Sequence, residues 1–260
     1  MQSSYTVAFM GFNLDAVRAR LPGRRIEWFQ SVDSTMTVAA RMAREGCASG
    51  TAVGADEQTA GVGRHRHSWH SEAEAGLYVS IVLRLPLDAT GLPVVMLALG
   101  LAAREAIVKT SGLAADLRWP NDVLLGGKKC AGILAQFEDD AIVAGIGINV
   151  NHTTLPAEIA VTATSLRMAG AGRVSREDLL VTLLETVEDC MNVLAQEGAD
   201  VILRLFSNVS TYAEGRRVRV EQDGAAIEGV TCGLDATGFL RVRRDDGKEM
   251  KILAGGVRPA

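Results

Sequence analysis

Cysteine is scarce in this sequence, and no segment is suited to cross a membrane. The four cysteines, Cys47, Cys130, Cys190 and Cys232, are scattered and form no Cys-x-x-Cys pair. This usage favours free thiols in a reducing compartment over a disulfide framework or a zinc site. No N-terminal signal segment is recognisable, and the longest apolar stretch, residues 92–103, is too short to span a bilayer. We therefore expect a cytoplasmic protein without a membrane partner.

The chain also lacks an excess of positive charge. Its 27 Lys and Arg residues against 31 Asp and Glu residues give a net charge of −4, so the protein as a whole does not attract nucleic acid. Hydrophobic residues make up 48% of the 260 positions and charged residues 22%, as in an ordinary globular chain that is long enough for one large domain or two. We expect no DNA partner.

The order of apolar patterns predicts an α+β fold with a mixed sheet. Helices are predicted at residues 14–21, 36–45, 93–110, 179–194 and 200–207, and strands at 26–32, 51–55, 76–84, 116–119, 131–138 and 142–150. Tight turns at 126–129 and 139–140 join neighbouring antiparallel strands, which a doubly wound sheet does not have. In this scheme Pro120, Asn121 and Asp122 form a turn after the strand at 116–119.

From about Asn208 the pattern changes to short β-like segments separated by Asp/Gly turns, including Asp223-Gly224. Strands of this length and spacing are typical of a small all-β barrel. We place a domain boundary near Ser207, which gives domains at 1–207 and 208–260.

A glycine loop at residues 56–69 is the first candidate site. Gly61 and Gly63 can turn backbone N–H groups toward an anion, and Arg64 adds a planar cation. The alternative is a solvated turn. The loop lacks the ending of a P-loop and the third glycine of a dinucleotide fingerprint. His65, His67 and His70 are unfavourable as metal ligands, because Arg64 and Arg66 among them repel cations, and we assign no metal site to them.

Two other positions carry polar groups beside buried segments. Ser34 and Thr35 precede a helix, where they cap its first turn and can also direct hydroxyl groups into a cleft. Lys129 lies at the end of a strand, beside residues that are predicted to be buried, and is interpreted as a fixed cation of the ligand cleft. The neighbouring Lys128 is expected to extend to solvent.

Four motifs follow one another along the chain: the glycine loop, Trp119-Pro120-Asn121-Asp122, the segment 127–134 with Lys129, and the segment 145–151. From about residue 26 to the end, the series closely resembles biotin protein ligases. The resemblance implies a class II synthetase-like catalytic domain at 1–207 and an SH3-like barrel at 208–260. It also implies that biotin and MgATP form biotinyl-5′-AMP, and that biotin then passes to a lysine of a biotin carboxyl carrier protein domain.

The resemblance also assigns site residues. Those implied for biotin are Ser34, Thr35, Gln58, Gly61, Val62, Gly63, Arg64, Lys129 and Gly132. Those implied for ATP and the adenylate are Gly61, Arg64, Trp69, Asn121, Lys129, Asn149 and Arg258. Lys129, Arg64 and Asp122 are the implied catalytic residues, and Mg²⁺ enters with ATP rather than at a dedicated protein site.

The chain departs from the usual family pattern Gly-Arg-Gly-Arg-x-Gly-Arg-x-Trp. Val62, Arg66 and His67 replace an arginine, a glycine and an arginine of the loop, and Met36 replaces a usual asparagine. We expect these departures to affect the loop and ATP affinity more than the chemistry. About twenty-five residues precede the part of the chain that carries the resemblance, so a form without the N-terminal DNA-binding domain of repressor-type members is expected.

The proposed chemistry needs fixed donors and cations around an α-phosphate, which the loop amides, Arg64 and Lys129 supply. Asp122 is expected to orient the acceptor lysine or to take its proton.

Two alternatives to this function remain. One is a lipoate or octanoate ligase or transferase of the same fold, although Cys130 looks like a buried hydrophobe rather than a nucleophile. The other is a non-catalytic biotin- or nucleotide-binding module. The oligomeric state stays open, with a homodimer among the states considered.

Overall fold

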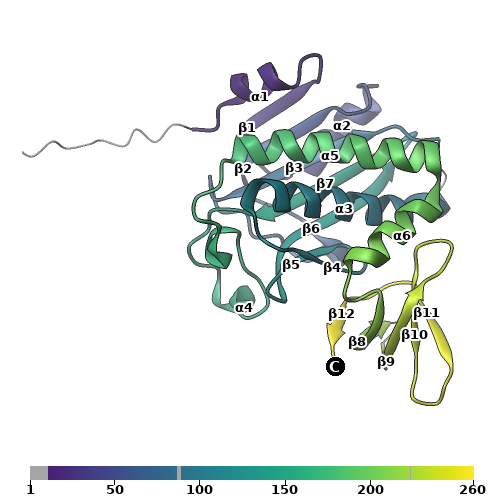
Figure 1. Cartoon of the computed structure of the whole chain (residues 1–260). Helices are drawn as coiled ribbons and strands as arrows, with labels where there is room; N and C mark the ends of the chain where they lie inside the picture. Colours follow the sequence, from purple (N-terminus) through teal and green to yellow (C-terminus); the bar gives the residue numbers. More distant parts are fainter. Residues whose placement is uncertain (1–10, 87–88, 223) are drawn as a thin grey trace, which may run out of the picture.

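A computed structural model of the chain describes residues 11–86, 89–222 and 224–260. The first ten residues of the predicted catalytic domain and Asp223 of the predicted turn lie outside this range. The described residues form a seven-stranded sheet in the order β1-β2-β3-β7-β6-β5-β4 and a five-stranded sheet in the order β11-β10-β9-β8-β12 (Figure 1). The predicted α+β class, with a mixed sheet and a separate C-terminal β unit, is confirmed.

The large sheet and its helices occupy the chain up to residue 209. Its strands are β1 (Ile26–Val32), β2 (Ala52–Gln58), β3 (Gly76–Leu83), β4 (Asp116–Arg118), β5 (Asp122–Leu125), β6 (Lys128–Glu138) and β7 (Ala141–Asn149). The helices are α1 (Leu14–Arg20), α2 (Thr35–Arg44), α3 (Leu92–Ser111), α4 (Ala157–Ala160), α5 (Arg176–Glu197) and α6 (Ala199–Val209). Strands β1 and β2 pair in parallel, and the other pairs between these strands are antiparallel. The boundary predicted near Ser207 therefore lies inside α6.

The turns differ from the predicted ones in two places. The β5–β6 turn consists of Gly126 and Gly127, whose φ angles of 55° and 80° suit residues without a Cβ. Lys128 and Lys129, predicted at the tip, already belong to β6, and Asp122, predicted in a turn, begins β5. As a result, both Asp122 and Lys129 lie on strands, where the sheet fixes their backbones.

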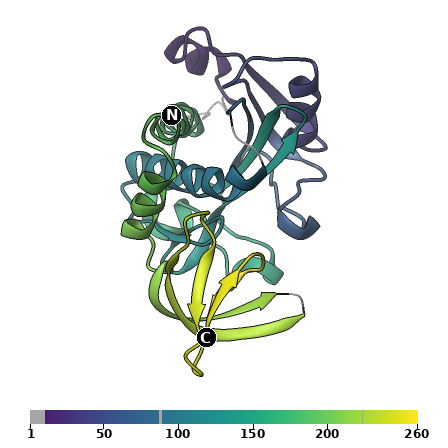
Figure 2. The same ribbon diagram turned by 90° about the vertical axis from the view of Figure 1, so that its right-hand side faces the viewer.

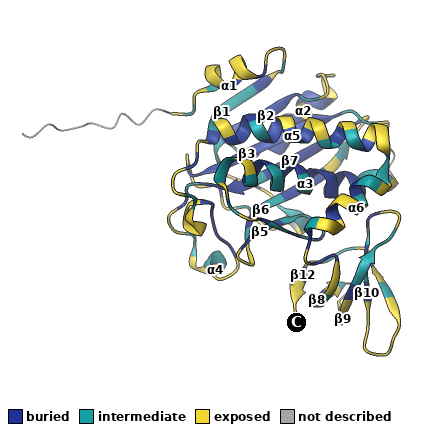
Figure 3. Ribbon diagram, in the orientation of Figure 1, coloured by how far each residue is buried: buried dark blue, intermediate teal, exposed yellow. Residues whose placement is uncertain are grey.

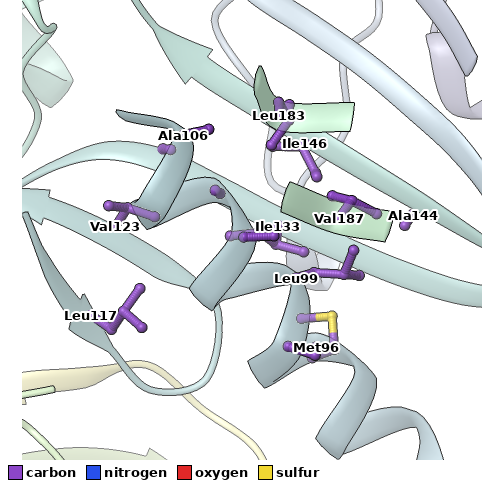
Figure 4. Close-up of a cluster of buried hydrophobic side chains, with 14 of the residues drawn as sticks. Met96, Leu99, Ala106, Leu117, Val123, Ile133, Ala144, Ile146, Leu183 and Val187 are labelled. Atoms are coloured by element: carbon purple, nitrogen blue, oxygen red, sulfur yellow. The ribbon is translucent and has the colours of Figure 1, made fainter. Parts of the chain in front are cut away.

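Helices cover both faces of the large sheet. Helices α3 and α5 lie side by side across one face, and α2 packs against β2, β3 and β7 on the other (Figure 1). Buried residues are concentrated in the central strands and in α3 (Figure 3). Figure 4 shows Leu99, Ile133, Ile146 and Val187 in the layer between α3, α5 and the sheet. Each such side chain contributes about 1.5–3 kcal/mol when fully buried.

The two faces of β6 and β7 carry different side chains, because successive residues of a strand point to opposite sides. Ile133, Ile146 and Ile148 belong to the core cluster that includes α3 and α5. The opposite face of the same strands presents Gly132 and Gly147, which are paired across the two strands. This alternation fills one face of the sheet and leaves room on the other.

The C-terminal sheet consists of β8 (Glu214–Gln222), β9 (Ala225–Leu234), β10 (Leu240–Arg243), β11 (Glu249–Ile252) and β12 (Val257–Pro259). It lies beyond one end of the large sheet (Figure 2). Several hydrogen bonds join the units. Among them, the Trp119 indole donates to Gly238 O at 3.0 Å, and Ser210 Oγ, in the connection between α6 and β8, donates to Leu117 O at 2.6 Å. Within the described part of the chain, no helix has the length and apolarity needed to cross a bilayer.

Candidate functional site

A cavity of about 720 Å³ opens on the α2 side of the large sheet. Its walls come from the start of α2, the glycine loop, strands β3 to β7 and the C-terminal unit. Twelve of the residues assigned from the sequence line it: Ser34, Thr35, Gln58, Val62, Gly63, Arg64, Trp69, Asn121, Asp122, Lys129, Gly132 and Arg258. Residues far apart in the sequence therefore meet in one concave surface.

The floor of the cavity is a row of paired residues that runs across the strands. Tyr78 pairs with Gly147, Gly147 with Gly132, Gly132 with Asp122, and Asp122 with Arg118. The Trp69 indole lies over the two glycines. A Cβ on Gly147 would be 2.5 Å from Trp69 Cε2, and a Cβ on Gly132 would be 2.9 Å from both Trp69 Cζ3 and Lys129 Nζ. Glycine is therefore required at both positions for this packing.

An uncharged polar cluster forms one end of the cavity. Thr35 donates its backbone N–H and its hydroxyl to Gln58 Oε1 at 2.9 and 3.0 Å, and Thr35 Oγ1 lies 2.8 Å from Ser80 Oγ. Gln58 Nε2 donates to Ser71 Oγ at 3.1 Å. Ser34 caps α2 by accepting from Met36 N at 3.3 Å. These bonds fix the orientation of the Gln58 amide, and its second N–H group can donate to a ligand.

Charged side chains gather at the other end. Lys129 Nζ lies 2.6 Å from Asp122 Oδ1 and 5.3 Å from the centre of the Trp69 ring. Arg118 Nη2 donates to the other oxygen, Asp122 Oδ2, at 2.7 Å. One carboxylate thus separates two cations and holds both at the edge of the cavity, and the group of three carries a net positive charge.

Arg64 connects the glycine loop with both units of the chain. Its Nη1 donates to Asn121 Oδ1 and to Gly255 O, each at 3.3 Å. Burial lowers the pKa of Arg64 from its usual value, and the nearby Asp122 partly opposes this shift. Asn121 is itself fixed, because its Nδ2 donates to Ile133 O at 2.8 Å. The guanidinium is therefore a partly desolvated cation in a set position.

Two assigned residues do not line the cavity. Gly61 is buried, and its carbonyl accepts from Trp69 N at 2.8 Å, which closes the base of the loop. Asn149 is buried and donates to Thr164 O at 3.0 Å. In this structure Asn149 supports the segment around residue 164 and makes no contact that points to a nucleotide. Its assignment to the nucleotide side stays a prediction.

Several cavity residues were missed by the sequence interpretation. Arg118, Tyr78, Gly145 and Gly147 line the cavity, and none of them was assigned a role. Gly145 and Gly147 are two positions apart on β7, so they lie on the same face of the strand. Two residues without side chains on one face indicate that this face leaves room for a ligand or another group. The sequence around Arg118 does not indicate that this residue lines the cavity, because its ion pair with Asp122 depends on the pairing of β4 with β5.

Cys130 lies on the other face of β6, in the core. It is fully buried, its Sγ donates to Val123 O at 3.4 Å, and burial raises its pKa to about 12. A neutral thiol in the core cannot attack an acyl group in the cavity.

We expect Cys130→Ala to keep the rate of acid activation within a few-fold of the parent rate, measured on a variant with a normal circular dichroism spectrum. Collapse of activity in that folded variant would indicate an acyl-enzyme transferase.

Comparisons with known proteins identify the family of this chain. A family model described as Biotin/lipoate A/B protein ligase family matches residues 28–152, and one described as Biotin protein ligase C terminal domain matches residues 215–257. The bifunctional ligase/repressor BirA of Bacillus subtilis is 31% identical over 240 residues, which cover 89% of this chain and 73% of that protein. The biotin–[acetyl-CoA-carboxylase] ligase of Mycobacterium tuberculosis is 32% identical over 235 residues, covering 88% and 86%.

A solved structure agrees over the whole fold. The biotin protein ligase from Aquifex aeolicus in complex with biotin and ATP matches with a TM-score of 0.81 and 29% identity, covering 91% of this chain and 99% of that one. The fold and site thus define a protein of the biotin and lipoate ligase class. Within this class, the chain belongs to the biotin protein ligase family.

Proposed function

We propose that the protein is an ATP-dependent biotin ligase, which converts biotin to biotinyl-5′-AMP and transfers the biotinyl group to a lysine of a carrier protein. The observation that carries this proposal is the division of one cavity into an uncharged polar end and a cationic end. Thr35 and Gln58 belong to α2 and β2, whereas Lys129 belongs to β6. In the sheet order, β3 and β7 separate β2 from β6, which corresponds to roughly 14 Å at about 4.8 Å per strand.

Biotin matches this division. Its ureido group is a neutral donor and acceptor that suits the hydrogen-bonding groups of Thr35 and Gln58, and its carboxylate suits Lys129 and Arg64. The dithiolane of lipoate offers no comparable hydrogen bonds. A polar cluster of this kind discriminates strongly against an analogue that leaves its buried groups unpaired. The polar end therefore favours biotin over lipoate or octanoate.

In the first step, a carboxylate oxygen of biotin attacks the α-phosphorus of ATP, and the bond from that phosphorus to the pyrophosphate oxygen breaks. Negative charge develops on the phosphoryl oxygens and on the leaving pyrophosphate. Lys129 and Arg64 supply fixed positive charge close to these atoms, and the partial burial of Arg64 strengthens its effect. The glycine loop supplies backbone N–H groups and shields the mixed anhydride from water.

ATP is expected to enter as its magnesium complex. Asp122 and Glu221 are the carboxylates among the described cavity residues, and Asp122 already faces Lys129 and Arg118. This set suits an ion that is held mainly by phosphate oxygens and water, which is how Mg²⁺ is commonly bound with nucleotides. Arg258, on the wall formed by the C-terminal unit, is proposed to face the nucleotide.

In the second step, the neutral amine of the acceptor lysine attacks the carbonyl carbon of biotinyl-AMP. The amide bond forms, AMP leaves, and the amine loses a proton. Asp122 lies at the cavity edge, but Arg118 and Lys129 contact both of its oxygens. We assign two roles to Asp122. Its main role is to position Lys129, and its second role is to orient the acceptor amine. The proposed acceptor is a biotin carboxyl carrier protein domain, as for a biotin–[acetyl-CoA-carboxylase] ligase, and the proposed location is the cytoplasm.

Exchange of labelled pyrophosphate into ATP tests the proposed function. The expected result is exchange that requires biotin and Mg²⁺ and is not supported by lipoate or octanoate. Incubation with ATP, biotin and a carrier domain should then give a protein that streptavidin detects, and replacement of the acceptor lysine of that domain should abolish the signal. Exchange with lipoate alone would show that the substrate assignment is wrong. A protein that binds biotin but supports no exchange with any acid would be a binding module.

A further inference from the structure

A second group of polar side chains lies outside the cavity lining, at the end of the glycine loop. His70 and Glu72 follow Trp69, and His152 follows β7. One potential ligand atom from each of these three residues lies within 4.8 Å of the other two. His70 Nε2 and Glu72 Oε2 are 3.9 Å apart, and the rings of His70 and His152 are 6.0 Å apart between centres.

The hydrogen bonds around His152 determine which of its nitrogen atoms is free to bind a metal ion. The Tyr78 hydroxyl donates to Glu72 O at 3.0 Å, so its oxygen is left to accept from His152 Nε2, 3.4 Å away. With its hydrogen on Nε2, the imidazole carries a lone pair on Nδ1. His152 is 1% exposed, and its Nδ1 is buried without a hydrogen-bond partner among the described residues. A buried polar atom of this kind requires a partner.

We propose that His70, Glu72 and His152 bind one Zn²⁺ ion. Two imidazoles and one carboxylate are a common zinc ligand set, with a fourth position left for water. Tetrahedral zinc needs its ligand atoms about 3.3 Å apart. His70 and Glu72 have side-chain exposures of 37% and 53% and can rotate toward the ion, whereas His152 is fixed. The bond from Nε2 to Tyr78 is the outer contact that zinc-binding histidines usually make.

This ligand set differs from the histidine group considered from the sequence. His65 and His67 contact each other edge to face, with ring centres 6.5 Å apart, and neither belongs to the group at His70. His70 instead meets a residue 82 positions further along the chain. The ion would link the end of the glycine loop to the segment after β7, and would thereby restrain Trp69 on the glycine floor. The proposal does not depend on the identity of the acid that the cavity binds.

Zinc titration of the full chain, stripped of metal with a chelator, tests the proposal. Calorimetry is expected to show one Zn²⁺ per chain. Replacing His70 by Ala, or Glu72 by Gln, should each weaken binding by about tenfold or more, because each removes one of three ligands. His67→Ala is the matched control: His67 lies on the same loop and is exposed, so its removal should leave the affinity unchanged. Both test positions are at least partly exposed, and these variants should fold.

Co²⁺ is the second probe, because its visible absorption reports nitrogen ligands and tetrahedral geometry. The parent and His67→Ala should show the same spectrum, and His70→Ala should lose it. Two results would overturn the proposal. One is the absence of zinc binding to the folded parent chain. The other is equal zinc affinity of the parent and His70→Ala, which would place the ion elsewhere, for instance on the cysteines.

Discussion

Replacing Lys129 by Met is expected to slow the formation of biotinyl-AMP by about a hundredfold or more and to leave the chain folded. The ammonium group is held 2.6 Å from Asp122 and projects over the glycine floor beside Trp69. There it can stabilise the negative charge that the phosphoryl oxygens gain in the transition state. Loss of one such preorganised donor typically costs about 3–4 kcal/mol. Asp122 keeps Arg118 as its partner, so the substitution does not leave a buried carboxylate without a cation.

Lys129→Met should slow acyl transfer by a smaller factor than adenylate formation. When biotinyl-AMP is supplied ready-made, charge develops mainly at the carbonyl and the leaving phosphate, so loss of the ammonium group should lower the transfer rate less. Lys128→Met is the matched control, because the neighbouring Lys128 is exposed and bonds to Ala160 O. Pyrophosphate exchange and single-turnover transfer, measured on both folded variants, separate the two steps. If Lys129→Met has the rates of the control in both assays, Lys129 takes no part in the chemistry.

The order of strands and helices could be predicted because it depends on local patterns. Alternation of apolar residues predicted the β3 strand, and the hydroxyl pair at 34–35 predicted the start of α2. The placement of Lys129 in the cavity also follows from a local signal, since a lysine at the end of a strand, next to residues predicted to be buried, needs a polar surrounding. Its neighbour Cys130 was correctly interpreted as a core residue by the same alternation.

Contacts that depend on the register of the sheet could not be predicted. The pairing of Arg118 with Asp122, and of Asp122 with Gly132, requires the β4–β5–β6 arrangement, and the sequence interpretation placed Asp122 in a turn. Arg64 reaches Gly255, 191 positions away, because the C-terminal unit packs beside the loop. No property of the glycine loop alone indicates this partner. His152 likewise gives no local signal for its position near His70.

The glycine floor gives the second large expected effect. In Gly147→Ala the new Cβ would lie 2.5 Å from Trp69 Cε2 and 2.7 Å from Nε1, closer than side chains approach each other. The indole must then leave the floor, and the surface between the polar and cationic ends of the cavity changes shape. We expect the biotin Kd to rise by about tenfold or more, equivalent to about 1.4 kcal/mol, which lies in the range of about 1–3 kcal/mol for overpacked sites.

The same substitution should have little effect on the melting temperature. Gly147 lies on the face of β7 opposite Ile146 and Ile148, so the core against α3 and α5 is unchanged, and Trp69 belongs to a surface loop that can shift. Gly256→Ala is the matched control, because Gly256 also lines the cavity and a Cβ there would have no heavy atom within 4 Å. Calorimetric titration with biotin and thermal melting of both variants measure the two effects. An unchanged biotin affinity in Gly147→Ala would mean that Trp69 does not remain over the glycines when biotin binds.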